Sequence, residues 1–185
     1  MKGSSLARFL PLAFLVFLFP LRLQAQAITT PASNVGLSAS VTESLTITVP
    51  VGSVAFGTLT PGATTVGLPT VPIQTDWVLK PSRTVVRLVG YFDTTNALTD
   101  AGPPAANITT SQVFGKFNGG ARNPFTQTIV GFGVAGSALE LFNVTITGAN
   151  KVATRNDTLD LEIDADAQQP AGDYTGTLRI QATAP

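Results

Sequence analysis

The sequence predicts an all-β protein, an immunoglobulin-like β-sandwich of about eight or nine antiparallel strands. Three observations predict this fold class. Apolar residues alternate with polar ones over short runs, and clusters of Gly, Pro, Asn and Asp interrupt the runs about every ten residues. In residues 28–185 no stretch of a dozen residues has apolar side chains spaced along one face of a helix. Such strands, with no helices between them, must pack sheet on sheet or close into a barrel, and the sandwich is preferred.

Residues 1–27 are predicted to be a secretory signal peptide. Lys2 and Arg8 precede the apolar run FLPLAFLVFLFP. This run is shorter than the roughly 20 residues that a membrane helix needs. Ala25-Gln26-Ala27 fits a cleavage site, so the exported chain is expected to begin at Ile28 and to form one sandwich domain, residues 28–185. We expect no membrane span after cleavage, and a periplasmic, cell-surface or extracellular location.

The first strands are expected before the turn signal Thr60-Pro61-Gly62. In Val35–Val49 apolar residues occupy every second position, and the alternation is interrupted near Glu43 and Ser44. The interruption predicts a β-bulge or bend there. Ser53–Leu59 is expected to be a second strand.

The middle of the chain supplies four further strands. Ile73–Leu79 places Trp77 on an apolar face, and Arg83–Phe92 is so rich in β-branched and aromatic residues that we expect a central strand. Ser111–Phe117 and Ala138–Thr147 are the other two.

The last two strands alternate most regularly. In Thr158–Asp166 the apolar and acidic side chains point to opposite faces, with Leu159, Leu161 and Ile163 against Asp160, Glu162 and Asp164. Tyr174–Ala182 follows the same rule. The turn residues Gln169–Gly172 between the two runs predict consecutive antiparallel strands joined by a tight connection.

The composition excludes several functional classes. The chain has no Cys and no His, which removes disulfides, Ser-His-Asp and Cys-His catalysis, and typical zinc or copper sites. Of its 11 basic residues, Lys2, Arg8 and Arg22 lie in the leader, so the exported chain carries 8 basic against 11 acidic residues, a net charge of −3. Nucleic acid is therefore not an expected partner.

The acidic residues between Asp157 and Asp166 allow a calcium site as an alternative to a solvated outer face. The cluster consists of Asp157, Asp160, Glu162, Asp164 and Asp166. Side chains two apart on a strand form a row with steps of about 6.6 Å, not a cage, which favours the solvated face. No pair of carboxylates can be singled out for hydrolysis, so no catalytic, metal or cofactor residue is assigned and enzymatic activity is not expected.

The fold explains two aromatic residues that could otherwise bind a sugar. Trp77 and Tyr174 fit sugar stacking, but Trp77 is expected in the core and Tyr174 in a tyrosine corner, with its hydroxyl bound to nearby backbone.

Three tripeptides match the N-glycosylation pattern and would matter only in a eukaryotic host, namely those beginning at Asn107, Asn143 and Asn156.

The stretch Pro170-Ala171-Gly172-Asp173-Tyr174, with the alternation that follows, resembles the C-terminal pattern of bacterial secreted pilus-type subunits, the spore coat protein U and archaic chaperone-usher group. The chain departs from that group in having no cysteine. The resemblance implies an incomplete immunoglobulin-like sandwich with a hydrophobic groove beside Leu178 and Ile180. A partner's N-terminal extension would fill this groove by β-strand addition.

The resemblance leaves two roles open for the N-terminal residues. Ile28–Ala39 is a candidate donor strand, with Val35, Leu37 and Ala39 in alternation, or Val35–Val41 is the domain's own first strand. Two functions follow. The expected one is a structural or adhesive surface protein, which as a pilus-like subunit would associate with itself or a partner protein through an edge strand. The alternative is a secreted carbohydrate-binding or glycan-processing sandwich.

Overall fold

The computed structural model describes residue 33 and residues 35–185. The predicted signal peptide, its cleavage site and Ile28 lie outside the described residues. The chain divides into two units, residues 1–39 and residues 40–185. In the first unit residues 35–39 form neither helix nor strand, and every strand described below belongs to the second. No helix in the described part of the chain is long and apolar enough to cross a membrane.

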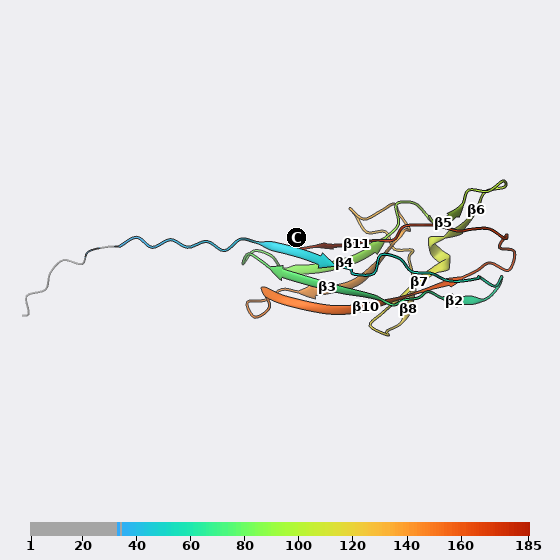
Figure 1. Ribbon diagram of the computed structural model, residues 1–185. Coiled ribbons are helices and arrows are strands. Elements are labelled where there is room, and N and C mark those ends of the chain that lie inside the picture. The colour runs from blue at the N-terminus through green and yellow to red at the C-terminus, as the bar shows by residue number, and fades with distance from the viewer. Residues whose placement is uncertain (1–32, 34) are drawn as a thin grey trace, which may run out of the picture. The chain divides into compact units, whose positions relative to one another are not determined.

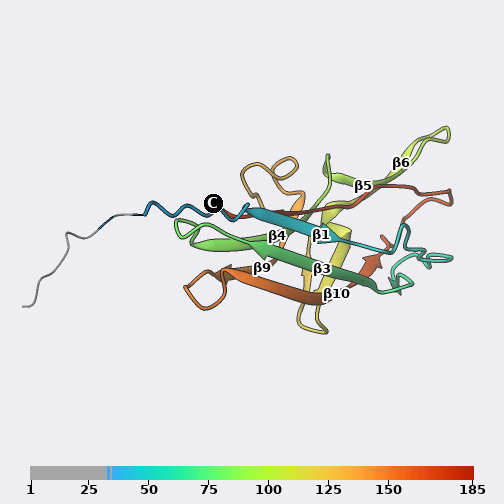
Figure 2. The same ribbon diagram turned by 60° about the vertical axis from the view of Figure 1, so that its left-hand side comes forward.

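The second unit is all-β, with antiparallel sheets packed against each other, as the sequence predicts (Figures 1 and 2). One sheet has the strand order β1-β3-β10-β7-β8, with β2 also paired to β10, and the other has the order β11-β4-β9. A separate hairpin consists of β5 and β6. The bounds are β1 (Ser44–Thr48), β2 (Thr64–Val66), β3 (Val71–Val78), β4 (Val85–Tyr91), β5 (Asn96–Asp100), β6 (Ala106–Thr109), β7 (Val113–Phe117), β8 (Arg122–Pro124), β9 (Ala138–Thr145), β10 (Val152–Asp164) and β11 (Arg179–Thr183), with one 3₁₀ turn, η1 (Thr110–Gln112).

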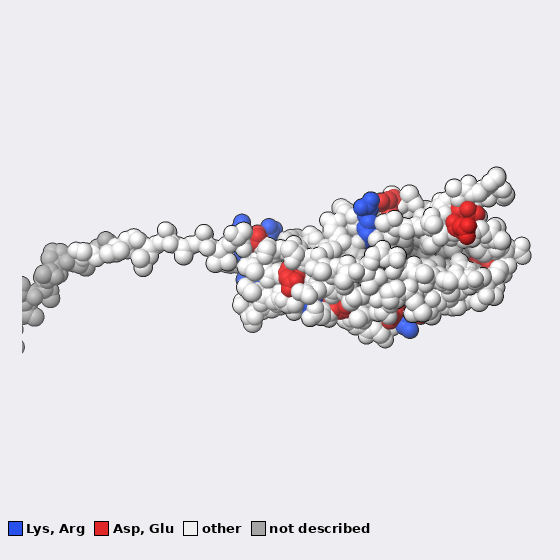
Figure 3. Space-filling model, in the orientation of Figure 1, with Lys and Arg blue, Asp and Glu red and all other residues white. Residues whose placement is uncertain are grey.

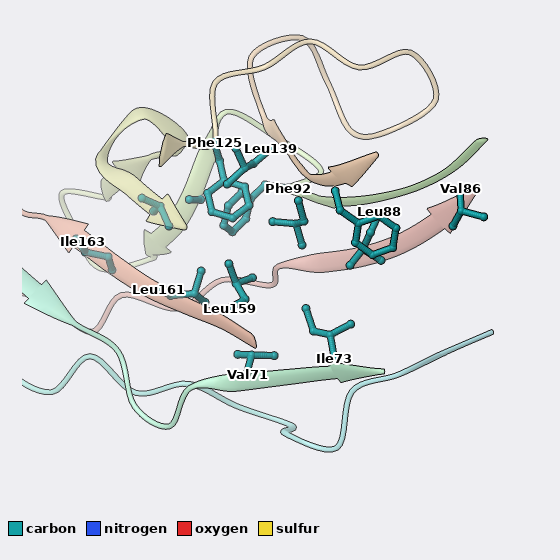
Figure 4. Close-up of a cluster of buried hydrophobic side chains, with 14 of the residues drawn as sticks. Val71, Ile73, Val86, Leu88, Phe92, Phe125, Leu139, Leu159, Leu161 and Ile163 are labelled. Atoms are coloured by element: carbon teal, nitrogen blue, oxygen red, sulfur yellow. The ribbon is translucent and has the colours of Figure 1, made fainter. Parts of the chain in front are cut away.

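The core lies between the two sheets, where alternate apolar side chains meet (Figure 4). From β3 and β10 come Val71, Ile73, Trp77, Leu159, Leu161 and Ile163, and from β4 and β9 come Val86, Leu88, Leu139 and Leu141, all of them buried. The predicted inward face of Thr158–Asp166 and the core position of Trp77 are confirmed. The indole Nε1 of Trp77 donates a hydrogen bond of 2.8 Å to the Asn150 carbonyl, which satisfies its polar atom at the edge of the core.

Part of the strand order matches the immunoglobulin pattern, while β2, β8 and β9 have no counterpart in it. In that pattern one sheet holds strands A, B, E and D and the other holds C, F and G. Here β1, β3, β10 and β7 take the places of A, B, E and D, while β4 and β11 take those of C and F. β4 is central in its sheet, as predicted for Arg83–Phe92. The place of G, beside β11, is taken by no strand of residues 35–185.

The prediction for the N-terminal strand is wrong in its first half. Val35–Val41 forms no strand, and the phase change at Glu43 and Ser44 marks the start of β1, not a bulge. The alternative that Val35–Val41 is the domain's own first strand is wrong, because residues 35–41 are not a strand and the first strand is β1.

The predicted strand Ser53–Leu59 is also wrong. Only Ala55 is paired there, through an isolated bridge to Leu68. Gly57 has a φ of +62°, which an extended strand cannot contain. The strands number eleven, not eight or nine, because the sequence did not indicate β2, β5, β6 and β8; of these, β2, β6 and β8 have only three or four residues, too few for alternation to show.

The prediction that the last two strands are joined by a tight connection as an antiparallel pair is wrong. β10 lies in the first sheet and β11 in the second, where β11 pairs with β4. The connection, residues 165–178, therefore crosses from one sheet to the other. The physical reason is that both edges of β10 are already occupied, by β7 and β3, so β11 buries its apolar face only by joining the opposite layer.

Two of the sheet ends lie away from β1 and β11, and both are partly covered. β8 has only three residues and ends with Pro124, and Gln127 exchanges two backbone hydrogen bonds with Ala138 at the start of the outer edge of β9. Phe125, which follows β8, is fully buried, and its ring meets that of Phe92 edge to face at 5.3 Å. This side of the sandwich is closed.

A buried carboxylate on β10, Asp157, forms an ion pair with Arg155 of the same strand. The Asp157 side chain is only 2% exposed and accepts hydrogen bonds from Arg155 Nε at 2.6 Å and Asn118 Nδ2 at 2.7 Å. The Arg155 guanidinium in turn lies 4.6 Å from the centre of the Phe142 ring. Both partners of the Asp157 carboxylate are therefore supplied by the protein, as a buried charge requires.

Candidate functional site

The main cavity is a groove of about 1030 Å³ between two extended segments, residues 49–61 and residues 169–180. Its inner lining is core, formed by buried side chains of both sheets: Val71, Phe92, Val113, Leu161 and Ile163. Asp173 is the one charged residue among the described residues that line it. The groove therefore opens onto apolar side chains of the core, between walls that also carry uncharged polar groups such as Ser53 and Gln169.

The strands that continue the groove are β1 and β11, which are the end strands of the two sheets and lie side by side (Figures 1 and 2). Their inward side chains are only half-buried although they contact the core: Leu45, Ile47, Ile180 and Ala182. Each strand is paired on one edge only, to β3 or to β4. On this side of the sandwich, inward apolar side chains therefore stay partly exposed. The outer backbone edges of β1 and β11 have no strand partner among the described residues.

The wall formed by residues 169–180 is firmly anchored. The Tyr174 hydroxyl donates to the Pro170 carbonyl at 2.8 Å and accepts from Gln169 Nε2 at 2.7 Å, which confirms the predicted tyrosine corner. Thr175 exchanges two backbone hydrogen bonds with Thr99 of β5, at 2.8 and 3.1 Å. At Gly176 a Cβ would collide with the Ala97 carbonyl oxygen, so only glycine allows this approach to β5.

The wall formed by residues 49–61 is held differently. The ladder of β1 ends at Thr48, and backbone pairing resumes only at the bridge of Ala55 with Leu68. Val54, Phe56 and Leu59 are half-buried and pack on the core. A Cβ on Gly67 would lie 2.6 Å from Val54 Cγ1 and 2.8 Å from Phe56 Cε1, so these two side chains close directly over the Gly67 backbone.

The acidic cluster predicted from the sequence is not one site. Glu162 and Asp164 point outward and share Arg122 of β8, whose Nε lies 2.7 Å from Glu162 Oε2, and Lys116 Nζ lies 3.5 Å from the other Glu162 oxygen. The remaining three acids have separate protein donors: Asp157 has Arg155 and Asn118, Asp160 has Thr70, and Asp166 has the Gln168 backbone. Across the described residues no group of three or more acids is arranged to hold a metal ion.

Ion pairs shift the pKa of two half-buried carboxylates. The hydrogen bond from Arg122, followed by that from Thr64, lowers the pKa of Asp164 below its ordinary value, against a smaller opposing effect of burial. The hydrogen bond from Arg83 likewise lowers the pKa of Glu43, which lies just before β1. Both carboxylates are therefore held in the ionised form, which suits structural ion pairs and not proton transfer.

Charge is dispersed elsewhere on the surface. The face drawn in Figure 3 is mostly uncharged, with acidic and basic side chains in small separate groups. Two further pairs link neighbouring elements, Arg87 with Glu140 at 2.7 Å and Arg179 with Asp93 at 2.9 Å. The three asparagines of the glycosylation pattern, Asn107, Asn143 and Asn156, are exposed.

No protein-family model matches the chain, and a search of curated proteins gave no match either. The groove therefore has to be interpreted from its own chemistry. Trp77 and Tyr174, the two aromatic residues that could have stacked on a sugar, are both committed to the fold. The sequence placed Leu178 and Ile180 beside the groove but did not predict its opposite wall. The Pro and Gly residues of that wall were the available indication that it is not a regular strand: Pro50, Gly52, Gly57 and Pro61.

Proposed function

We propose that this protein is an exported structural or adhesive subunit, without catalytic activity, that assembles by β-strand addition. The groove between residues 49–61 and 169–180 is the acceptor, and Val35–Val41 of a second copy is the added strand. The observation that carries this proposal is a groove that opens onto core side chains beside two adjacent end strands whose inward side chains are half-buried.

The chemistry of the groove favours an extended chain over a small polar ligand. An added strand obtains its affinity from backbone hydrogen bonds to a free edge and its specificity from alternate side chains in apolar pockets. β11 offers that free edge, and the inner lining of the groove offers apolar core side chains, while its walls carry uncharged polar groups and one acidic residue, Asp173. Small-molecule sites, in contrast, place a few convergent polar groups in the pocket.

Val35–Val41 has the properties of such a strand. Val35, Leu37 and Val41 are 80%, 93% and 82% exposed, so large apolar side chains are left in solvent. With Ala39 they occupy every second position and would share one face of an extended chain. No charged residue occurs between Ser33 and Thr42, so burial of this segment requires no ion to be desolvated.

The resemblance of Pro170–Tyr174 and the following strand to spore coat protein U and archaic chaperone-usher subunits supports the same proposal. In that group the sandwich lacks its last strand and receives one from a neighbour. The vacant place beside β11 corresponds to that missing strand. Nothing in the groove favours the alternative of carbohydrate binding, since its lining has Tyr174 and Phe rings already packed on the core.

The test is the oligomeric state of the exported chain, measured by size-exclusion chromatography with light scattering over a range of concentrations. We expect concentration-dependent oligomers from the wild-type chain and monomers from Leu37→Asp, because a carboxylate cannot enter the apolar groove. The matched control is Ser38→Asp, which adds the same charge on the opposite face and should still assemble. A Leu37→Asp chain that assembles like the control would refute the proposal.

A crosslink locates the contact. Because the chain has no cysteine, a Leu37→Cys chain mixed with a Leu178→Cys chain can form a disulfide between copies only where these positions meet. We expect the mixed dimer under mild oxidation, and much less of it when Ser38→Cys replaces Leu37→Cys.

A further inference from the structure

Residues 50–59, called the strap below, occupy part of the groove from within. The strap lines the groove along with residues 169–180. Its apolar side chains Val54, Phe56 and Leu59 point to the core as those of an added strand would, but each stays half-buried. The strap is thus an occupant supplied by the protein itself.

The strap is attached at few points. Its backbone makes one bridge, in which Ala55 and Leu68 exchange hydrogen bonds of 2.8 and 2.9 Å. Among the described residues, the backbone of residues 50–54 has no hydrogen-bond partner. By comparison, β10 pairs with β3 continuously from Val152–Val78 to Leu159–Val71. Segments with few backbone hydrogen bonds and half-exposed contacts open at a smaller free energy than core strands.

The ends of the strap are built to bend. Pro50 follows β1, and a Cβ added to Gly52 would meet no atom within 4 Å, so the backbone at this glycine is free of packing. Gly57 adopts a φ of +62°, which only glycine adopts readily. Between these glycines the backbone is held only by the Ala55–Leu68 bridge, whereas β1 before it and the Thr60–Ala63 turn after it have hydrogen bonds of their own.

We infer that the strap is a displaceable internal occupant that must leave the groove before a strand from a second copy can enter fully. This inference rests on the proposed function. With the strap closed, Val54 and Phe56 cover the place where the side chains of the incoming strand would reach the core. Assembly then proceeds only from the open fraction, which lowers the apparent affinity by that fraction.

A disulfide staple tests this inference. Ala55 and Leu68 form a hydrogen-bonded antiparallel pair, whose Cα atoms lie about 5.5 Å apart, within the range of a disulfide. The double variant Ala55→Cys/Leu68→Cys would lock the strap when oxidised. The matched control, Gln127→Cys/Ala138→Cys, staples the same kind of pair on the closed side of the sandwich.

The readout is assembly of the exported chain, oxidised and reduced. We expect the oxidised strap staple to reduce the fraction assembled at a given concentration at least tenfold, reductant to restore it, and the control staple to have no effect. Undiminished assembly with the strap stapled would overturn this inference alone. A wild-type chain that remains monomeric at every concentration would overturn the proposed function and this inference together.

Amide hydrogen exchange gives a second measurement that does not depend on assembly. In the Leu37→Asp background the Ala55 and Leu68 amides should exchange at least a hundredfold faster than amides of the β3–β10 ladder. Equal protection of the two sets would overturn the inference, because a strap as stable as the core cannot open ahead of global unfolding.

Discussion

The two sides of the sandwich differ in how far the inward apolar side chains at their edges are covered. On the closed side, Phe125 is fully buried and Gln127 occupies the edge of β9. On the side of β1 and β11, inward residues such as Ile47 and Ile180 remain half-buried. Both sides have alternating apolar side chains, so the difference is made by the presence or absence of a neighbour. Alternation determines which face of a strand turns inward, but not whether that face becomes covered.

The largest expected effect comes from truncating one apolar side chain on each side. Phe125→Ala should lower the free energy of unfolding by about 3 to 5 kcal/mol, because a fully buried ring is replaced by a cavity. Ile180→Ala should cost about 1 kcal/mol, because the side chain is already partly in water. Urea unfolding in the monomeric Leu37→Asp background measures both.

The same pair of variants sharpens the comparison when assembly is allowed. In the assembling chain the cost of Ile180→Ala should rise, since an added strand would bury that side chain, while the cost of Phe125→Ala should stay unchanged. Equal costs at the two sites in the monomer would contradict the description of the β1–β11 side as open.

An intermediate effect is expected at Gly67. In Gly67→Ala the new methyl group meets Val54 and Phe56, so the strap must shift, at a cost of about 1 to 2 kcal/mol. Exchange of the Ala55 amide should become faster while amides on the closed side do not change. Gly52→Ala is the control, since its added methyl group has no neighbour within 4 Å. If Gly67→Ala left Ala55 exchange unaltered, the strap would not depend on this contact.

The smallest effect concerns acid. The pKa of Asp164 is lowered in the folded protein by Arg122 of β8, so its ion pair contributes stability above its ordinary pKa of about 4 and loses it as the pH falls through the lowered value. The contribution is below about 1 kcal/mol because the pair is partly exposed. Asp164→Asn should therefore flatten the loss of stability between about pH 5 and pH 2, measured by urea titration. A wild-type slope in this variant would show that the pair adds nothing to the closed side.

Much of the fold could be predicted from the sequence where strands are long and border the core. Thr158–Asp166 and Arg83–Phe92 have enough residues for alternation or β-branched content to be evident, and both correspond to strands of the structure. Strands of three residues, such as β2 and β8, are too short to show a period. They are defined by their partners across the sheet, which a single sequence does not reveal.

The candidate site could be predicted in part. The Pro170–Tyr174 turn correctly indicated the tyrosine corner, because that motif is local and its hydrogen bond spans four residues. The opposite wall was not predicted. Val54 and Phe56 alternate like strand residues, but whether they form a ladder depends on the φ of Gly57 and on contact with Gly67, which is distant in sequence.

The anchoring of the Tyr174–Thr183 segment has a consequence for fidelity. The Thr99–Thr175 bridge and the ladder to β4 prevent this segment from sliding along its own axis. A strand that slips by one residue turns all of its side chains to the wrong face. If a strand is added there as proposed, a segment that cannot slide would present its backbone groups to that strand in one fixed alignment.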